Sequence, residues 1–182
     1  IRINRSMTQR LKNAPAISIP TPDQTVERAV LDYYEQLGWN GIHAENYLWR
    51  GLFGLTFWSI IFDESHGSFH HPLQRQPSDL HEASFFESRA SSLQEKLDKL
   101  KTRKQAISHI KEVHDQKEGV ANRFVTWHES LLPALEVMIQ KVPLKALKAT
   151  LMEMSKIMRD NSKGFPDLFL WNEKTYQFYE VK

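Results

Sequence analysis

Three ionisable residues near the end of the sequence have the types and spacing of a hydrolytic metal site. Asp167 follows Pro166, and Glu180 and Lys182 stand on either side of Val181 in the tripeptide Glu-Val-Lys. Carboxylates of this kind hold oxygen-preferring divalent cations, and a neighbouring lysine can orient a water molecule or offset phosphate charge. This chemistry requires a fold that brings the three side chains together.

The segment that carries them, PDLFLWNEKTYQFYEVK, predicts two short strands joined by a turn. If residues 173–174 form a two-residue turn, Asp167 faces Glu180 across the hairpin, and a four-residue loop keeps the same pairing. Directly opposed residues have Cβ atoms about 4.5–5.5 Å apart. Glu180 and Lys182 share a face because strand side chains alternate. An odd loop would instead place the two carboxylates diagonally.

Two interpretations of this hairpin remain open. Like charges directly opposite each other are unfavourable, so one carboxylate would need a proton or a cation, and a divalent ion resolves the repulsion. Alternatively, Asp167 caps a turn, and Glu180 and Lys182 form an exposed pair. The first interpretation predicts phosphodiester hydrolysis assisted by a metal ion, and the second predicts no chemistry at all.

The rest of the chain predicts a mostly helical domain around this terminal hairpin. Apolar residues at helical spacing predict a first helix from an N-cap at Asp23 to Gly38, and a second over Tyr47–Phe62 that is entered near Glu45 or Asn46. Residues 84–119 predict an amphipathic pair of helices or one long helix. Two more helices are predicted over 121–142 and 143–161. Residues 39–46 are expected to form a turn and residues 63–83 a loop. Two strands alone are marginal in water, so the hairpin should pack on helices or pair with further strands.

The composition is that of a globular domain without disulfides. The 182 residues include no cysteine, 41% are hydrophobic and 25% are charged. Residues 1–22 combine prolines with basic side chains and predict a basic N-terminal arm, and residues 23–182 predict one domain. No secretory signal is recognised. The first residue is Ile1 and not methionine, so a start further upstream is expected. The strongest apolar run, Tyr47–Phe62, is shorter than the roughly 20 residues of a membrane span, and no membrane partner is expected.

A basic face is predicted for the stretch over residues 141–163, which includes the last long helix. Its lysines recur at close to helical spacing and could follow a nucleic-acid backbone, or they could form an ordinary solvated face. The candidates are Lys141, Lys145, Lys148 and Lys156, together with Lys163 at the end of the same basic stretch.

The terminal motif resembles the PD-(D/E)xK nuclease motif, here Pro166-Asp167 and Glu180-Val181-Lys182. More specifically, the segment that carries it is similar to the VRR-NUC domain. A second stretch, GWNGIHAENYLWRGLFGLTFWSIIFD over 38–63, together with SFFESR over 84–89, resembles the Fanconi-anaemia-associated nucleases and their bacterial relatives. The resemblance covers residues 20–182, and residues 95–160 contribute little to it.

This resemblance implies an α+β fold with a restriction-endonuclease-like core, in which helices flank a mixed sheet. It implies a structure-selective DNA endonuclease and 5′-to-3′ exonuclease that acts near 5′ flaps. The implied cofactor is one or two Mg²⁺ or Mn²⁺ ions. The implied setting is DNA repair, including the repair of interstrand crosslinks. The expected partners are branched or flapped DNA and other repair proteins. The expected location is the cytoplasm and nucleoid, or the nucleus of a eukaryote.

The resemblance also implies a role for individual residues. Asp167 and Glu180 correspond to the metal-binding carboxylates, Lys182 to the motif lysine and Glu45 to a further acidic metal ligand. The main-chain carbonyl of Val181 completes the metal shell.

One feature departs from the family pattern. Related chains continue beyond the motif lysine, so this chain is expected to be a fragment whose core sheet is incomplete. A catalytically inactive module that binds DNA or a repair partner is the alternative function.

Overall fold

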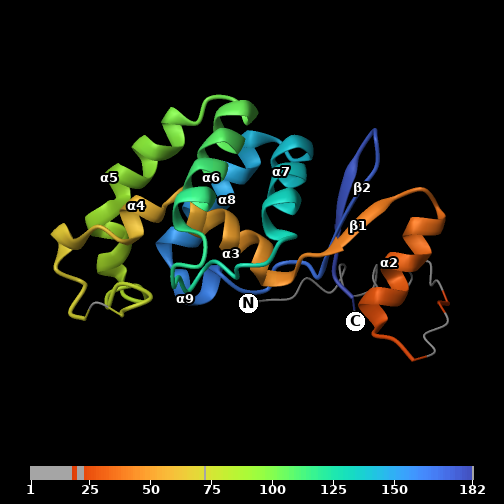
Figure 1. Ribbon diagram of the computed structural model, residues 1–182, viewed down its shortest axis with the longest axis horizontal. Helices are drawn as coiled ribbons and strands as arrows, with labels where there is room; N and C mark the ends of the chain where they lie inside the picture. The colour runs from red at the N-terminus through yellow and green to blue at the C-terminus, as the bar shows by residue number, and fades with distance from the viewer. Residues whose placement is uncertain (1–17, 20–22, 72, 182) are drawn as a thin grey trace, which may run out of the picture.

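The chain folds as a helical bundle next to a small sheet, and a separate helix covers the far side of that sheet (Figure 1). A computed structural model describes residues 18–19, 23–71 and 73–181. Most of the predicted arm (1–22), and Lys182, therefore lie outside the described residues. Within the described part, no helix is both long and apolar enough to span a bilayer.

The elements follow one another along the chain with a single strand among the helices and a hairpin at the end. They are α2 (Val26–Gln36), β1 (Asn40–His43), α3 (Glu45–Thr56), α4 (Trp58–Ile61), the 3₁₀ turn η1 (Glu64–His66), α5 (Ala83–Lys99), α6 (Arg103–Lys117), α7 (Leu131–Lys141), α8 (Leu144–Lys156), α9 (Met158–Asn161), β2 (Leu168–Trp171) and β3 (Tyr176–Tyr179).

The predicted hairpin is confirmed, and its register is the one that an even turn requires. Leu168 pairs with Tyr179 and Trp171 with Tyr176 in the antiparallel pair of β2 and β3. The next pair in this register is Asp167 and Glu180. Asn172 closes the turn, because its side-chain oxygen accepts hydrogen bonds from the main-chain N–H groups of residues 174 and 175.

The central strand β2 is buried on both faces, which explains its nearly continuous apolar sequence. Phe169 packs into the main core with the helical bundle. Leu168 and Leu170 pack against Leu31 of α2 in a second, smaller cluster. The hairpin is thus packed on both faces and paired with a further strand, as expected for two short strands that are marginal on their own.

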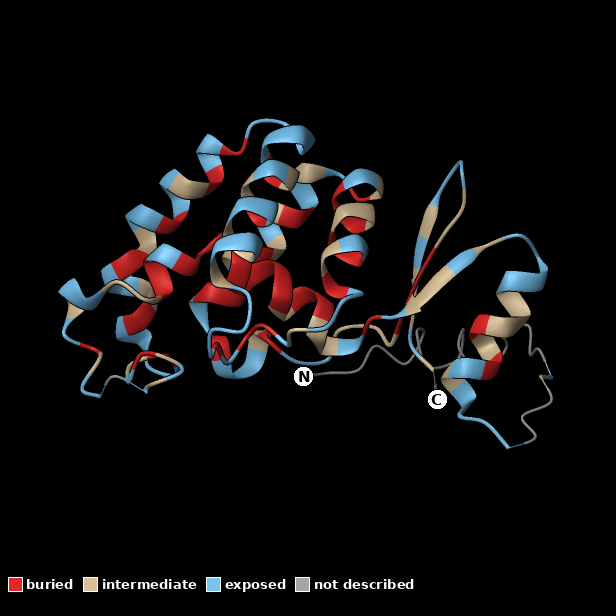
Figure 2. Ribbon diagram, in the orientation of Figure 1, coloured by how far each residue is buried: buried red, intermediate tan, exposed pale blue. Residues whose placement is uncertain are grey.

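Helix α3 lies at the centre of the bundle, where it is buried on most sides (Figure 2). Two glycines permit this close packing. A Cβ atom on Gly51 would lie 2.8 Å from the Leu131 side chain, and one on Gly54 would lie 2.7 Å from the Val125 side chain. These two glycines, three residues apart, therefore bring α3 close to its neighbours.

The expectation that only the end of the chain forms sheet is wrong. Residues 40–43, expected within a turn, form β1, which pairs antiparallel with β2 from Asn40 opposite Trp171 to His43 opposite Leu168. A strand of four residues that includes a glycine is too short to show a period of two. Its partner strand supplies the missing information. Gly41 suits this position, because a Cβ atom there would press on the buried side chains of Leu170 and Leu31.

Several helix boundaries also differ from the predicted ones. Thr25, not Asp23, caps α2, with its hydroxyl accepting a hydrogen bond from the Arg28 N–H at 3.3 Å. The apolar run breaks at Phe57 into α3 and α4. Residues 121–130, predicted as helix, are irregular, and α7 begins only at Leu131. The stretch over 84–119 forms a helix pair, because Thr102 and Gln105 form a capping box that starts a new helix.

Candidate active site

Asp167 stands at the point where the sheet meets the start of α3. Its main-chain carbonyl accepts hydrogen bonds from the N–H groups of Ala44, at 2.6 Å, and Glu45, at 3.1 Å. Its carboxylate oxygen Oδ2 accepts a 2.7 Å hydrogen bond from the main-chain N–H of Val181. One residue therefore ties together the ends of all three strands and the first turn of the central helix.

Glu45 is the first residue of α3 and adopts an unusual backbone conformation. Its φ angle is +29°, which costs a non-glycine residue on the order of 1–3 kcal/mol and is often found at functional sites. The side-chain amide of Asn46 donates a 3.3 Å hydrogen bond to the Glu45 carboxylate. The same helix N-terminus has no side-chain cap, and the main-chain carbonyl of Asp167 accepts from its first N–H groups instead.

Glu45 also lines an open groove between α2 and the β1–α3 segment. This groove has a volume of about 750 Å³, and its lining includes His43, Tyr47 and Arg28. Burial raises the pKa of Tyr47, so its hydroxyl stays neutral and able to donate a hydrogen bond around neutral pH. The groove is large enough to hold part of an extended polar ligand beside Glu45.

Glu180 follows β3 directly and is exposed. The strand register places it opposite Asp167, on the face of the sheet that carries Phe169 and Phe178 and that packs on the bundle. Trp49 of α3 fixes this junction, since its ring stacks on Phe165 and also contacts Phe178. Lys182, the predicted motif lysine, lies outside the described residues.

The residues predicted to bind metal fit Mg²⁺ or Mn²⁺ in the kind of oxygen atom that they carry. Glu45, Asp167 and Glu180 would supply carboxylates, and Val181 would supply a main-chain carbonyl, which are the hard ligands that these ions prefer. The side-chain oxygen Oδ1 of Asn46 is buried there without a hydrogen-bond partner. Across residues 23–71 and 73–181, however, no three acidic or histidine side chains converge closely enough to enclose an ion.

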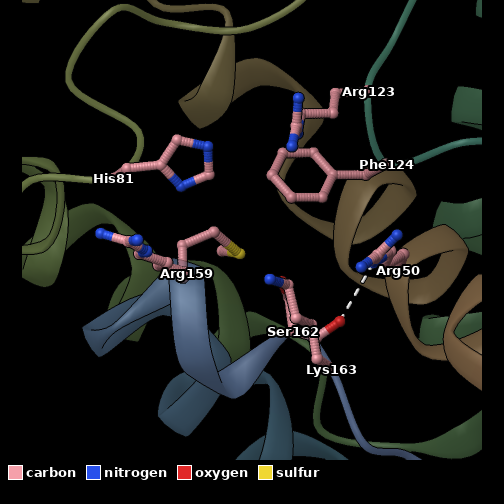
Figure 3. A pocket seen from close by; sticks show the side chains of 8 residues that line it. Arg50, His81, Arg123, Phe124, Arg159, Ser162 and Lys163 are labelled. Carbon is pink, nitrogen blue, oxygen red and sulfur yellow. Dashed lines mark hydrogen bonds between the residues drawn. The ribbon is translucent and has the colours of Figure 1, made fainter.

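A second feature of the site is a pocket lined by positive charge (Figure 3). Its volume is about 290 Å³, and its polar lining comes from four separate parts of the fold. Those residues are Arg50 of α3, His81 of the loop before α5, Arg123 of the segment before α7, and Arg159, Ser162 and Lys163 at the end of α9. Phe124 and Met158 add apolar walls. Such a concentration of N–H donors suits an anion with several oxygen atoms, such as a phosphate.

The Arg50 guanidinium is held in place by a 3.0 Å hydrogen bond from its Nε to the main-chain carbonyl of Ser162 (Figure 3). This contact joins α3 to the segment that leads through Lys163 to Asp167. Sequence reasoning missed Arg50, His81, Arg123 and Arg159 because they lie far apart along the chain. The sequence did contain one signal for Arg50, since it is the only charged residue inside the apolar run Tyr47–Phe62.

The five predicted DNA-contact lysines do not form one continuous face. Lys163 lines the basic pocket. The Lys141 ammonium donates to the main-chain carbonyl of Asn172 at 2.7 Å, and that of Lys156 pairs with Glu153 at 2.6 Å. Lys145 and Lys148 lie on α8, the first exposed and the second half-buried. Of the five lysines, Lys163 lines the pocket, Lys141 lies on α7, and Lys145, Lys148 and Lys156 lie on α8.

Comparison with known proteins places this arrangement in a family context. Residues 101–182 match the VRR-NUC domain. A Fanconi-associated nuclease 1 homolog of Schizosaccharomyces pombe is 34% identical over 164 residues, which are 87% of this chain and 23% of that protein. A homolog of the same name from Pseudomonas aeruginosa is 31% identical over 168 residues, 91% of this chain and 30% of that protein. The chain thus spans less than a third of these relatives.

Solved structures give the same answer for the fold. The chain is similar to paFAN1 bound to 5′-flap DNA with a gap, with a TM-score of 0.82 and 32% identity for the complex with a 1-nucleotide flap, and 0.80 and 31% for a 2-nucleotide flap. Both matches cover 92% of this chain and 31% of the solved one. The chain is therefore similar to Fanconi-associated nucleases over most of its own length, and its residues 101–182 match the VRR-NUC domain, as its motifs indicated.

Proposed function

We propose that this chain forms part of a metal-dependent deoxyribonuclease that cuts phosphodiester bonds near 5′ flaps and degrades DNA in the 5′-to-3′ direction. The observation that carries the proposal is the contact between Asp167 and Val181, beside the backbone of Glu45, at one end of the sheet. The similarity to paFAN1 bound to 5′-flap DNA supports the substrate class. DNA repair, including the repair of interstrand crosslinks, is the proposed setting.

The proposed roles follow from the chemistry of each group. Asp167, Glu180, Glu45 and the carbonyl of Val181 would hold Mg²⁺ or Mn²⁺. When bound, such an ion supplies charge neutralisation at the phosphate and a more acidic water molecule. Lys182 would orient the attacking water or offset negative charge on the scissile phosphate.

The basic pocket adds a binding function to this proposal. Its arginines and Lys163 would bind a phosphate group of the DNA, since guanidinium groups match phosphate oxygens in bidentate fashion. Lys163 lies shortly before Asp167 in the sequence, so a phosphate held there would be anchored to the segment that ends in the carboxylate. The pocket would therefore fix the register of the DNA relative to the metal.

A cleavage assay tests the proposal. A 5′-flap duplex labelled at either end is incubated with Mg²⁺, with Mn²⁺ and with a chelator, using the chain and its Asp167→Ala variant. Cleavage that depends on the metal and is lost in the variant is the expected result. Loss of a metal ligand should remove several kcal/mol of transition-state stabilisation.

The same experiment distinguishes the alternative, an inactive binding module. Binding of the flap duplex without cleavage, unchanged by Asp167→Ala, would favour that module and overturn the nuclease. Asp160→Ala is a matched control, because Asp160 is an exposed aspartate on α9 outside the proposed metal ligands. It should cleave like the unmodified chain.

A further inference from the structure

Arg89 is a charged side chain in an unexpected place. It is fully buried, at 0% exposure, and is among the largest such side chains of the described residues. Arginine is almost never fully buried unless it is paired, because removing its charge from water is costly. The residue ends the SFFESR motif, to which neither the proposed metal site nor the basic pocket assigns a role.

The partners of Arg89 come mainly from the loop that precedes its helix. Its Nη1 donates to the Asp79 carboxylate at 2.7 Å, and its Nη2 donates to the Ser68 hydroxyl at 3.3 Å. Its guanidinium also lies over the Phe85 ring, 4.6 Å from the ring centroid. The side chain thus joins both ends of the loop formed by residues 67–82 to one turn of α5.

The loop is tightly connected around this buried charge. The Ser78 N–H donates to the Ser68 carbonyl at 2.8 Å, and the Gln74 amide bridges the carbonyls of Ser68 and Gln76. Leu80, next to Asp79, is only 1% exposed and packs into the main core. These contacts, together with the 2.9 Å hydrogen bond from the Glu82 N–H to the Asp79 carbonyl, hold the main chain on both sides of the residue that follows Leu80.

That residue is His81, which lines the basic pocket opposite Arg123 and Phe124 (Figure 3). Within the lining, His81 is the residue contributed by the segment between η1 and α5. We propose that the Arg89–Asp79 pair is a clamp that positions His81 in the basic pocket for its anionic ligand. This inference rests on the phosphate-binding role proposed for the pocket.

An electrostatic effect of the Arg89–Asp79 pair and a positioning effect on His81 predict opposite changes in anion affinity for the variant Asp79→Asn. If the pair acted only through its electric field, Arg89→Met would weaken anion binding and Asp79→Asn would strengthen it, because the second variant removes a negative charge. If the pair positions His81, both variants weaken binding. The loss should be about tenfold, which corresponds to one hydrogen bond to a charged group.

The test is a titration of the chain with inorganic pyrophosphate, followed by the NMR signals of the His81 ring. The unmodified chain, Asp79→Asn and Arg89→Met are compared at a temperature well below the unfolding of each. Both variants should bind about tenfold more weakly than the unmodified chain, with altered His81 ring shifts before ligand is added. Unchanged affinity in folded Asp79→Asn, or a tighter one, would overturn the clamp. Because Asn is nearly isosteric with Asp, this variant carries the test even if Arg89→Met does not fold.

Two controls are needed. The first tests whether a general loss of stability would weaken pyrophosphate binding, and the second tests whether pyrophosphate binds in the basic pocket. Leu97→Ala, in the same helix and 2% exposed, should lower stability without changing pyrophosphate affinity. Arg159→Ala, in the pocket lining, should weaken binding directly. If the unmodified chain binds no pyrophosphate, the clamp proposal is wrong even when flap cleavage succeeds. If pyrophosphate binds but no cleavage occurs, only the nuclease proposal is wrong.

Discussion

The Asp167 carboxylate accepts a 2.7 Å hydrogen bond from the main-chain N–H of Val181. This contact crosses the end of the hairpin at the register position where Asp167 faces Glu180. It orients the carboxylate and at the same time fixes the main chain whose carbonyl is a proposed metal ligand. This hydrogen bond therefore helps to organise the proposed metal site.

Asp167→Asn and Asp167→Ala should separate the two roles of this residue. Asn keeps an oxygen acceptor for the Val181 N–H, so its unfolding free energy should stay close to that of the unmodified chain. Ala leaves a half-buried N–H unpaired and should cost about 1 kcal/mol. Both variants should lose affinity for Mn²⁺ in calorimetric titration. Equal Mn²⁺ binding by all three proteins would remove Asp167 from the metal site.

The hairpin register was predictable because its turn and its strands are consecutive in sequence. Once residues 173–174 are placed in the turn, pairing follows by counting, and Asp167 meets Glu180. The same local reasoning located most helices, since their apolar residues recur at the helical period. Boundaries such as the start of α7 were missed because residues 121–130 contain apolar side chains that pack irregularly against α3.

The third strand and the basic pocket were beyond the reach of sequence reasoning for a physical reason. β1 is a strand because β2 offers it hydrogen bonds, not because of a pattern of its own. The pocket residues lie on four segments whose proximity depends on how the bundle closes. The family resemblance supplied Glu45, which local spacing alone presents as an ordinary first-turn glutamate favoured by the helix dipole.

Gly54→Ala should destabilise the chain through the segment that carries Arg123. A Cβ atom there would lie 2.7 Å from Val125 and 2.8 Å from Phe124. Overpacking of this kind costs about 1–3 kcal/mol, which exceeds the gain of up to about 1 kcal/mol from replacing a helical glycine. Thermal unfolding measures the difference, with Ser59→Ala, at an exposed position of α4, as the control. A more stable Gly54→Ala would show that the contact relaxes freely.

Lys141→Met should loosen the hairpin turn without weakening contacts to DNA phosphates. The Lys141 ammonium donates to the carbonyl of Asn172 at 2.7 Å and so anchors the turn to α7. Faster hydrogen exchange at the amides of the turn is expected, and the salt dependence of DNA binding should not change. Lys163→Met should do the reverse and lower the salt slope by about one unit. A lower slope for Lys141→Met would assign this lysine to the DNA backbone.

His109 should make stability fall at acidic pH. The pKa of its ring is lowered mainly by burial and also by Lys96, while a 3.0 Å hydrogen bond to the Thr56 carbonyl and the charge of Glu112 oppose the shift. Between the unfolded value of about 6.5 and the lowered folded value, the unfolded chain binds more protons. Stability is therefore complete above about pH 6.5 and decreases as the pH falls through the folded pKa.

The variant His109→Gln keeps an N–H donor for Thr56 but cannot titrate. Chemical unfolding at several pH values should give a smaller decrease below about pH 6.5 for this variant than for the unmodified chain. His71→Gln, at an exposed loop position, serves as the control and should retain the full decrease. Identical pH profiles for His109→Gln and the unmodified chain would mean that other groups cause the acid sensitivity. In that case the buried contact between α6 and the end of α3 does not depend on the protonation of His109.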